Sequence, residues 1–375
     1  MTTGGNTSGT KTEPPRDFAG AAAAEAARRR LYTLIILALA GLVLAGIVVS
    51  FMLGRYPISP PQLFAALGDK LREILSRMTN GAVETTKSAL ATDQMRAILF
   101  NVRLPRIFLA CMVGCCLSAA GASYQGVFQN PMAAPDILGA SSGAAAGAAL
   151  AILLELGSRM VMIFAFAASL ITIALVMLVS RAARGNRVLR IILAGIMVSS
   201  LCNALTSFIK LVADPNNILP EITYWMMGSL AKTKPAEVLF AFVPMALGLA
   251  PLLLLRWRIN LLTLSDSEAR TMGVPVGAVR VAVIICATLI TAASVSVSGL
   301  IGWVGLVVPH LARRLVGNNY RHLLPASMLG GALFLLIVDN VSRNLLLTEI
   351  PIGILTSVIG APFFIWLITR KKETI

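Results

Sequence analysis

Long apolar runs, separated by short polar or basic segments, recur along most of the chain. Most runs are about 20 residues long, the length that an α-helix needs to cross about 30 Å of hydrocarbon. The interruptions divide the chain into ten expected membrane-spanning helices, at 31–53, 104–127, 135–156, 159–180, 189–213, 236–256, 280–298, 301–316, 323–347 and 352–369. The pattern predicts an all-α polytopic membrane protein whose membrane domain covers residues 31–372.

The charge pattern orients these spans. The first run is 23 residues long and begins directly after Arg28-Arg29-Arg30, whereas the apolar core of a signal peptide has about 7–15 residues. Basic residues favour the cytoplasmic side of a span, so the polar segment 1–30 is expected to be a disordered cytoplasmic tail. Ten spans return the C-terminus to that side. We therefore expect a multi-pass protein of the cytoplasmic membrane, with both termini inside and an external loop at 54–103.

The composition agrees with this class and excludes others. Hydrophobic residues make up 57% of the chain and charged residues 13%, against about 25% charged residues in soluble domains. The net charge of +15 does not indicate nucleic acid, because basic residues gather in the cytoplasmic loops of membrane proteins. The five cysteines lie inside apolar runs without a CxxC pair. Neither a disulfide nor a metal site is expected from them.

The segment QNPMAAPDILGASSGAAAGAA (129–149) interrupts the helical pattern after the second span. Pro131 and Pro135 break a helix, and irregular backbone at membrane depth persists only where it is buried in protein or lines a water-filled cavity. The broken part therefore indicates a transport pathway. Gly139, Gly143 and Gly147 recur every four residues and predict a face for close helix packing.

The connection TLSDSEARTMGVPVGAVR (263–280) carries a helix-start signal on the expected cytoplasmic side. Ser265 and Glu268 match the S-x-x-E capping box, so a short helix is predicted there that stops at Gly273-Val274-Pro275. Two interpretations are open for this helix. It is either an ordinary surface turn or a rigid element that receives force from a soluble partner.

Two arginines, Arg103 and Arg106, stand at the entrance of the second span and face outward in this topology. Either they snorkel beside lipid phosphates, or they meet an acidic external partner. Asp339 is the one acidic residue well inside an expected span, and it precedes Arg343 by four residues. This spacing predicts a local ion pair on one helix face.

Absent motifs narrow the class of transporter. The chain has no G-x-x-x-x-G-K-[ST] phosphate loop, and it lacks the several mid-membrane carboxylates that a proton- or sodium-coupled carrier needs. No cofactor is expected in this chain. A pathway that is passive or driven by a separate motor remains, with a motor-independent secondary transporter or channel as the alternative. A membrane enzyme ranks third, because no catalytic constellation is visible.

Several stretches match one family in order. They are RLPRIFLACMVGCCLSAAGASYQGVFQNPMAAPDILGASSGA (103–144), ILAGIMVSSLCNALTSFI (192–209), YWMMGSL (224–230), LLTLSDSEARTMGV (261–274), SGLIGWVGLVVPHLARRLVG (298–317), RHLLPASMLGGALFLLIVDNVSR (321–343) and EIPIGILTSVIGAPFFIWLITRKK (349–372). Together they resemble the permease subunits of the iron-chelate, haem and cobalamin ABC importers. The resemblance omits the polar N-terminus and much of 54–102, and it implies a ten-helix bundle like that of the cobalamin importer permease.

The resemblance also implies partners and cargo. It implies a second permease copy (a homodimer or a sister permease), two cytoplasmic ABC ATPases that hold ATP and Mg²⁺, and an external substrate-binding protein. The implied cargo is a metal chelate. A ferric siderophore is the first expectation, with haem and cobalamin as alternatives in the same family.

Site roles follow from the resemblance, position by position. Three arginines correspond to those that accept glutamates of the binding protein: Arg103, Arg106 and Arg343. The inner gate corresponds to Asn130, Pro131 and Met132, where Met132 replaces the usual leucine with similar volume. The coupling region for the ATPases lies at 257–280, with its expected residues at Ser265, Glu268, Ala269, Arg270 and Gly273.

Overall fold

The computed structural model describes residues 18–79, 88, 90–185, 187–264, 266–273 and 275–369. The described chain forms helices joined by short connections, without a β-strand. The α-helices are α1 Phe18–Met52, α2 Pro60–Met78, α3 Asp93–Ala97, α4 Leu104–Val127, α5 Ala140–Leu153, α6 Ser158–Ala182, α7 Arg187–Val212, α8 Ile218–Met226, α9 Pro235–Leu262, α10 Asp266–Thr271, α11 Val276–Ser298, α12 Val304–Val316, α13 Tyr320–Asn344 and α14 Ile352–Thr369. A π-helical turn, η1 Ile98–Arg103, precedes α4, and a 3-10 turn, η2 Pro135–Leu138, precedes α5.

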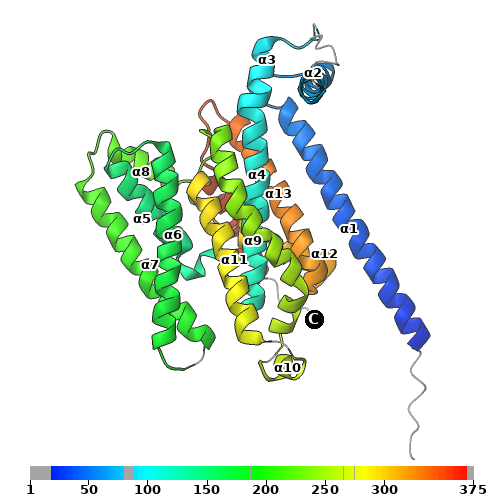
Figure 1. The fold of residues 1–375 in the computed structure, drawn as a ribbon, viewed down its shortest axis with the longest axis vertical. Coiled ribbons are helices and arrows are strands. Elements are labelled where there is room, and N and C mark those ends of the chain that lie inside the picture. Colours follow the sequence, from blue (N-terminus) through cyan, green and yellow to red (C-terminus); the bar gives the residue numbers. More distant parts are fainter. Residues whose placement is uncertain are drawn as a thin grey trace, which may run out of the picture.

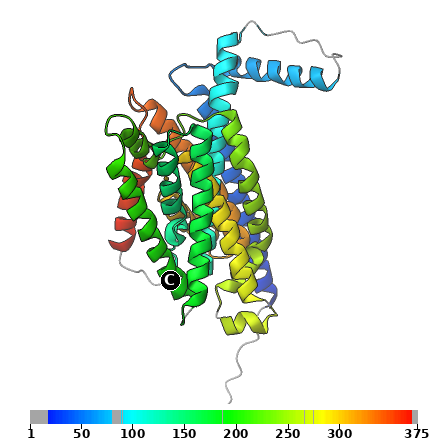
Figure 2. The ribbon, with the colours of Figure 1, turned by 60° about the vertical axis from the view of Figure 1, so that its left-hand side comes forward.

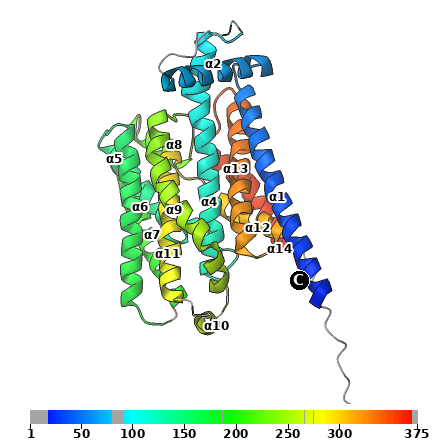
Figure 3. The same cartoon turned by 45° about the vertical axis from the view of Figure 1, so that its right-hand side comes forward.

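The long helices run roughly side by side, with α4, α9 and α11 near the middle (Figure 1). Helix α2 lies across one end of the bundle and α10 lies at the opposite end (Figures 1 and 3). These are called the α2 end and the α10 end below. Helices α5–α8 gather on one side of α11, and α1 runs along the opposite edge (Figure 1). Figure 2 shows α2 projecting sideways from α3, beyond the body of the bundle.

Each of the ten expected spans contains a helix, which confirms the all-α polytopic class. Seven helical segments of the described chain are long and apolar enough to cross a membrane, and α5 and α14 are shorter apolar helices. Helix α12 has 13 residues and is therefore about 20 Å long. It is shorter than expected because the chain reaches it through non-helical backbone, with φ of 68° at Gly299 and 69° at Trp303.

Two expected irregular segments are helical instead. Helix α1 begins at Phe18, so residues 18–30 of the expected disordered tail continue the first span, and residues 1–17 lie outside the described chain. The sequence FAGAAAAEAARRR is rich in alanine, the residue with the strongest helix propensity. An i,i+4 ion pair between Arg29 and Glu25, 2.5 Å long, adds local support.

The expected loop at 54–103 contains α2, α3 and η1, and α3 to α4 form one helical segment, Asp93–Val127, of 35 residues. Thr92 caps this segment, because its side chain accepts the Met95 N–H at 3.2 Å. Leu63 of α2 and Leu99 of η1 are both about 1% exposed and belong to the main hydrophobic core. Burial of these side chains fixes the segment as folded structure instead of a loose loop.

Glycines allow the central helices to touch through their backbones. A Cβ atom at Gly114 of α4 would lie 2.2 Å from the carbonyl oxygen of Gly331 in α13. On α5, a Cβ at Gly147 would lie 2.3 Å from the Phe164 carbonyl oxygen of α6, and one at Gly143 would lie 2.2 Å from the Thr172 hydroxyl. The predicted small-residue packing face is confirmed. The approach of Gly114 to Gly331 fixes the register of α4 against α13, and the two ends of α4 carry the residues of interest.

Candidate functional site

At the α10 end, α4 stops at Val127 and the chain breaks as expected before η2. Gln129 has a φ of 50°, which non-glycine residues rarely adopt. The Asn130 side chain accepts the Met132 N–H at 2.9 Å, and the Asn130 carbonyl accepts the Ala133 N–H at 3.1 Å. These bonds hold Asn130–Met132 in a compact turn, and Met132 is 48% exposed. The broken segment is confirmed, and its role as a gate stays a prediction.

Gln129 connects this turn to the segment before α10. Its Nε2 donates to the carbonyl oxygens of Leu262, at 2.9 Å, and Leu264, at 2.8 Å. Leu262 is the last residue of α9. No role was predicted for Gln129 from the sequence, because its partners lie more than 130 positions along the chain. No local pattern announces such a contact.

The predicted short helix in the connection 263–280 is present as α10, Asp266–Thr271. Among the expected coupling residues, Ala269 is fully buried, whereas Glu268, Arg270 and Gly273 are exposed. Gly273 ends the helix with a φ of 75°, a conformation that glycine adopts without steric cost. Ser265 lies outside the described residues, so the predicted capping box is not tested.

A polar network joins four helices near the turn Asn130–Met132. The Arg313 guanidinium donates to the Gln125 side chain and to the Tyr320 hydroxyl, the latter at 3.2 Å. Asn260 of α9 accepts the Tyr320 N–H at 2.7 Å and donates to the Asn319 side chain at 2.9 Å. The network links α4, α9, α12 and α13 at the α10 end.

The three arginines expected at an external surface lie at the α2 end, but their side chains are buried. Arg106 pairs with Asp339 of α13 at 2.9 Å and with Glu349 through Nη1–Oε1 at 3.0 Å and Nη2–Oε2 at 2.9 Å. Arg343 contacts the other Asp339 oxygen at 3.2 Å, which confirms the predicted i,i+4 pair. Two arginines therefore share one buried carboxylate.

Arg103 is held differently from the other two. It donates to the carbonyl oxygens of Phe51 and Tyr56, at the end of α1 and in the connection to α2. Arg103, Arg106 and Arg343 are 4%, 5% and 8% exposed, so lipid phosphate does not meet their guanidinium groups in this conformation. We call these three arginines, with Asp339 and Glu349, the arginine cluster. Its accessible member is Glu349, whose side chain is 28% exposed. Sequence reasoning missed it because it follows α13 in a short connection without a motif.

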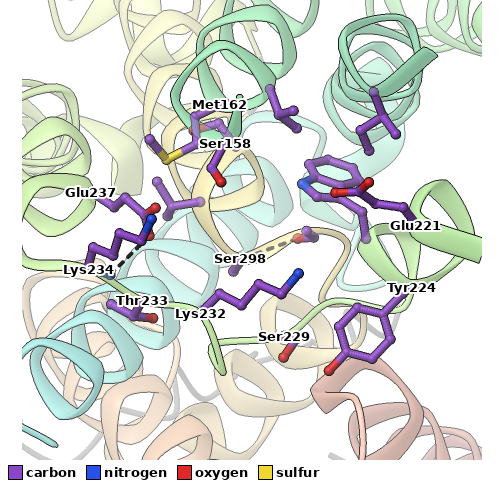
Figure 4. A pocket seen from close by; sticks show the side chains of 16 residues that line it. Ser158, Met162, Glu221, Tyr224, Ser229, Lys232, Thr233, Lys234, Glu237 and Ser298 are labelled. Atoms are coloured by element: carbon purple, nitrogen blue, oxygen red, sulfur yellow. Dashed lines mark hydrogen bonds between the residues drawn. The ribbon is translucent and has the colours of Figure 1, made fainter. Parts of the chain in front are cut away.

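A cavity of about 340 Å³ opens among α5, α6, α8, the connection 227–234 and the end of α11. Figure 4 shows Lys232, Glu221 and Tyr224 around it, with the hydroxyls of Ser158 and Ser229. Its wall is mixed, since apolar and charged side chains line it together. Across the described residues, no group of three or more His, Cys, Asp or Glu side chains is arranged to hold a metal ion.

The described residues form an all-α polytopic bundle with a broken segment at one end, after α4. The model of the FecCD transport family matches residues 42–370. The chain belongs to the FecCD transport family.

Named relatives cover most of the chain. The molybdate import system permease protein MolB of Haemophilus influenzae is 40% identical over 347 residues, 91% of this chain and 97% of that protein. A probable iron chelatin transport system permease protein of Helicobacter pylori is 42% identical over 280 residues, 75% of this chain and 85% of that protein. The hemin transport system permease protein HmuU of Yersinia pestis is 41% identical over 291 residues, 75% of this chain and 86% of that protein.

A solved structure agrees with the fold. It is described as an inward-facing conformation of a metal-chelate type ABC transporter, and it is 38% identical with a TM-score of 0.79. The match covers 90% of this chain and all of the solved chain. The family resemblance and the permease fold inferred from sequence are thereby confirmed.

Proposed function

We propose that this chain is the membrane subunit of an ATP-driven importer that carries a metal chelate across the cytoplasmic membrane. The observation that supports this most is the family match over 42–370, together with a bundle that places a short helix, α10, beside a broken helix at one end. ATP and Mg²⁺ would bind a separate ATPase, since the sequence has no phosphate loop.

The α10 end is proposed to be cytoplasmic. The α6–α7 connection and the end of α9 lie there (Figure 1) and carry Arg181, Arg184, Arg256 and Arg258. Excess arginine and lysine in short loops marks the cytoplasmic side. Both termini would then be cytoplasmic, and α2 and α3 would lie outside.

Coupling and gating are proposed for the α10 end. The exposed face of α10, with Glu268 and Arg270, would contact an ATPase subunit. The turn Asn130–Met132 would close the pathway where it meets the same turn of a second permease copy. A compact polar turn with one exposed thioether suits this role, because methionine adapts its shape to a changing contact.

Docking of an external binding protein is proposed for the α2 end, in a form that the burial of the arginines constrains. The cluster holds three arginines against two carboxylates, Asp339 and Glu349, so it retains one positive charge. An acidic side chain of the binding protein would approach Arg106 by replacing Glu349, the exposed carboxylate. Charge complementarity of this kind steers encounter and fixes orientation.

The cargo proposed first is a ferric siderophore or a similar metal chelate, because relatives named for iron chelatin and hemin transport share about 40% of their aligned residues with this chain. Molybdate is the second candidate. The permease named for molybdate import aligns over 347 residues, against 280 for the iron chelatin relative. The longer alignment, over 91% of this chain against 75%, is the observation that favours molybdate as a candidate cargo.

The test is uptake into vesicles that contain the permease, its cognate ATPase and ATP, with the cognate binding protein outside. Labelled ferric siderophore, haem, cobalamin and molybdate are offered separately. Uptake of one metal compound that requires ATP inside the vesicles supports the proposal. Uptake that persists without the ATPase, or that follows a proton gradient, supports the secondary-transporter alternative instead.

A further inference from the structure

We propose that Gln129 is a positioning residue that ties the turn Asn130–Met132 to the end of α9, so that movement of α10 reaches the gate. This inference rests on the coupling and gate roles proposed above and supplies the residue that connects them. It depends on contacts at Gln129 itself, and those contacts are independent of cargo.

The Gln129 amide uses both of its donors on the segment that leads to α10. An amide NH₂ group has two N–H donors, and both are used, on the carbonyl oxygens of Leu262 and Leu264. The last carbonyl groups of a helix lack partners within the helix. Gln129 therefore satisfies the end of α9 from another part of the chain. Leu264 lies two positions before Asp266, where α10 begins.

The turn Asn130–Met132 is held by its own hydrogen bonds. The Asn130 N–H donates to the Gln125 carbonyl at 3.2 Å, and the Asn130 side chain fixes Met132. Gln129 itself has the uncommon φ of 50°, which persists only where the surroundings determine it. The Gln129 side chain and the next three residues thus form one unit. A shift of the Leu262 and Leu264 carbonyl groups would therefore displace Met132 by a similar distance.

Behind this unit, the end of α4 packs closely against α9 and α13. A Cβ atom at Gly126 would lie 2.8 Å from the Ile259 side chain and 2.9 Å from the Tyr320 ring. The last turn of α4 therefore presses directly on the last turns of α9. Contact without a gap transmits displacement, because packed interiors are nearly incompressible. The packing transmits a movement of α9 toward α4, and the two Gln129 hydrogen bonds transmit a movement of α9 away from it.

The experiment uses the permease assembled with its cognate ATPase in lipid nanodiscs, with Met132→Cys as reporter. The rate at which a membrane-impermeant maleimide labels this cysteine is measured with and without ATP. Labelling of the parent protein, which has five native cysteines, gives the background. Gln129→Glu and Gln129→Met keep the side-chain length but cannot donate to the two carbonyls, whereas Gln129→Lys can. Gln94→Glu, an exposed change in α3, is the matched control.

ATP is expected to change the labelling rate in the reporter protein, in Gln129→Lys and in the Gln94→Glu control. In Gln129→Glu and Gln129→Met this response should fall about thirtyfold, the effect of two lost hydrogen bonds on an equilibrium, while ATP hydrolysis continues. An unchanged response in both donor-free variants overturns the role of Gln129. If the reporter protein itself shows no response to ATP, the proposed gate and coupling roles fail. If Gln129→Glu does not assemble with the ATPase, the uncharged Gln129→Met decides alone.

Discussion

The two ends of α4 are held in opposite ways. At the α2 end its first turn is fixed by charge, since Arg106 contacts Asp339 and Glu349. At the α10 end its last turn accepts a hydrogen bond from the Arg313 guanidinium at the neutral Gln125 side chain, and the chain beyond it is held through the neutral amide of Gln129. Breaking a buried ion pair costs several kcal/mol, whereas a neutral hydrogen bond contributes about 1 kcal/mol net. The contrast supports the proposal that the α2 end of α4 stays fixed while its α10 end moves.

The largest expected effect comes from Asp339→Ala. This change leaves Arg106 and Arg343 buried without their shared carboxylate, which should lower the free energy of unfolding by about 3–5 kcal/mol. Thermal unfolding of the purified protein measures it. Asp93→Ala is the control, because Asp93 also pairs with an arginine but its side chain is 78% exposed, and its loss should cost about 0–1 kcal/mol. Equal effects of the two changes would contradict a rigid, charge-fixed α2 end.

A smaller effect is expected from Gly273→Val at the α10 end. A residue with a Cβ atom pays about 1–2 kcal/mol to adopt the φ of 75° found at Gly273. With valine there, the turn that ends α10 should be disturbed and the orientation of α10 should no longer be fixed. The measurement is substrate transported per ATP hydrolysed in the reconstituted complex, which should fall. Gly273→Asn is the matched control, because asparagine tolerates this conformation. If valine and asparagine give the same ratio as glycine, α10 is an ordinary surface turn.

Glu349→Gln should sharpen the account of docking. It removes the accessible carboxylate from Arg106 and leaves Asp339 in place, so an acidic partner meets less competition. Affinity for the binding protein should rise a few-fold and should weaken more steeply as salt screens the charges. Binding to the immobilised complex measures both, with the exposed Glu155→Gln as control. Weaker docking by Glu349→Gln would show that Glu349 supports the partner instead of competing with it.

The smallest effect concerns pH at the α2 end. Burial raises the pKa of Asp69, but the Arg96 guanidinium and the Ser88 N–H outweigh it and lower this pKa below its usual value. The contact therefore stabilises α2 above the ordinary aspartate pKa, near 3.8, and is lost as pH falls through the lowered value. Hydrogen exchange of α2 should accelerate only in that acidic range. In Asp69→Asn this pH dependence should vanish, and its survival would assign it to another group.

Local patterns predicted the parts of the fold that depend on neighbouring residues. Apolar runs located the ten helices, two prolines located the break at 129–135, and the spacing of Asp339 and Arg343 predicted their ion pair. Helix α2 was not predicted, because its apolar residues are interspersed with charged ones at helical spacing. It therefore forms no continuous apolar run, although 19 residues are helical.

The remaining site contacts join distant positions. Arg106 meets Asp339 across 233 positions, and the register that brings them together is set by backbone contacts such as Gly114 with Gly331. Sequence spacing carries no information on such a register. For the same reason the burial of Arg103 and Arg106 was not foreseen. The carbonyl groups beside Arg103 belong to α1 and the connection after it, and the acids beside Arg106 belong to α13 and the connection after it.

We propose that ATP moves the α10 end of α4 while its α2 end stays fixed. Distances between spin labels in the ATPase-bound complex test it directly, with labelled subunits diluted by unlabelled ones. One pair joins Val102 and Leu346 at the α2 end, and the other joins Met132 and Leu178 at the α10 end, all on side chains that are 48–65% exposed. The account predicts that ATP shifts the Met132–Leu178 distance and leaves the Val102–Leu346 distance unchanged. Equal shifts in both pairs, or a shift only at the α2 end, would contradict it.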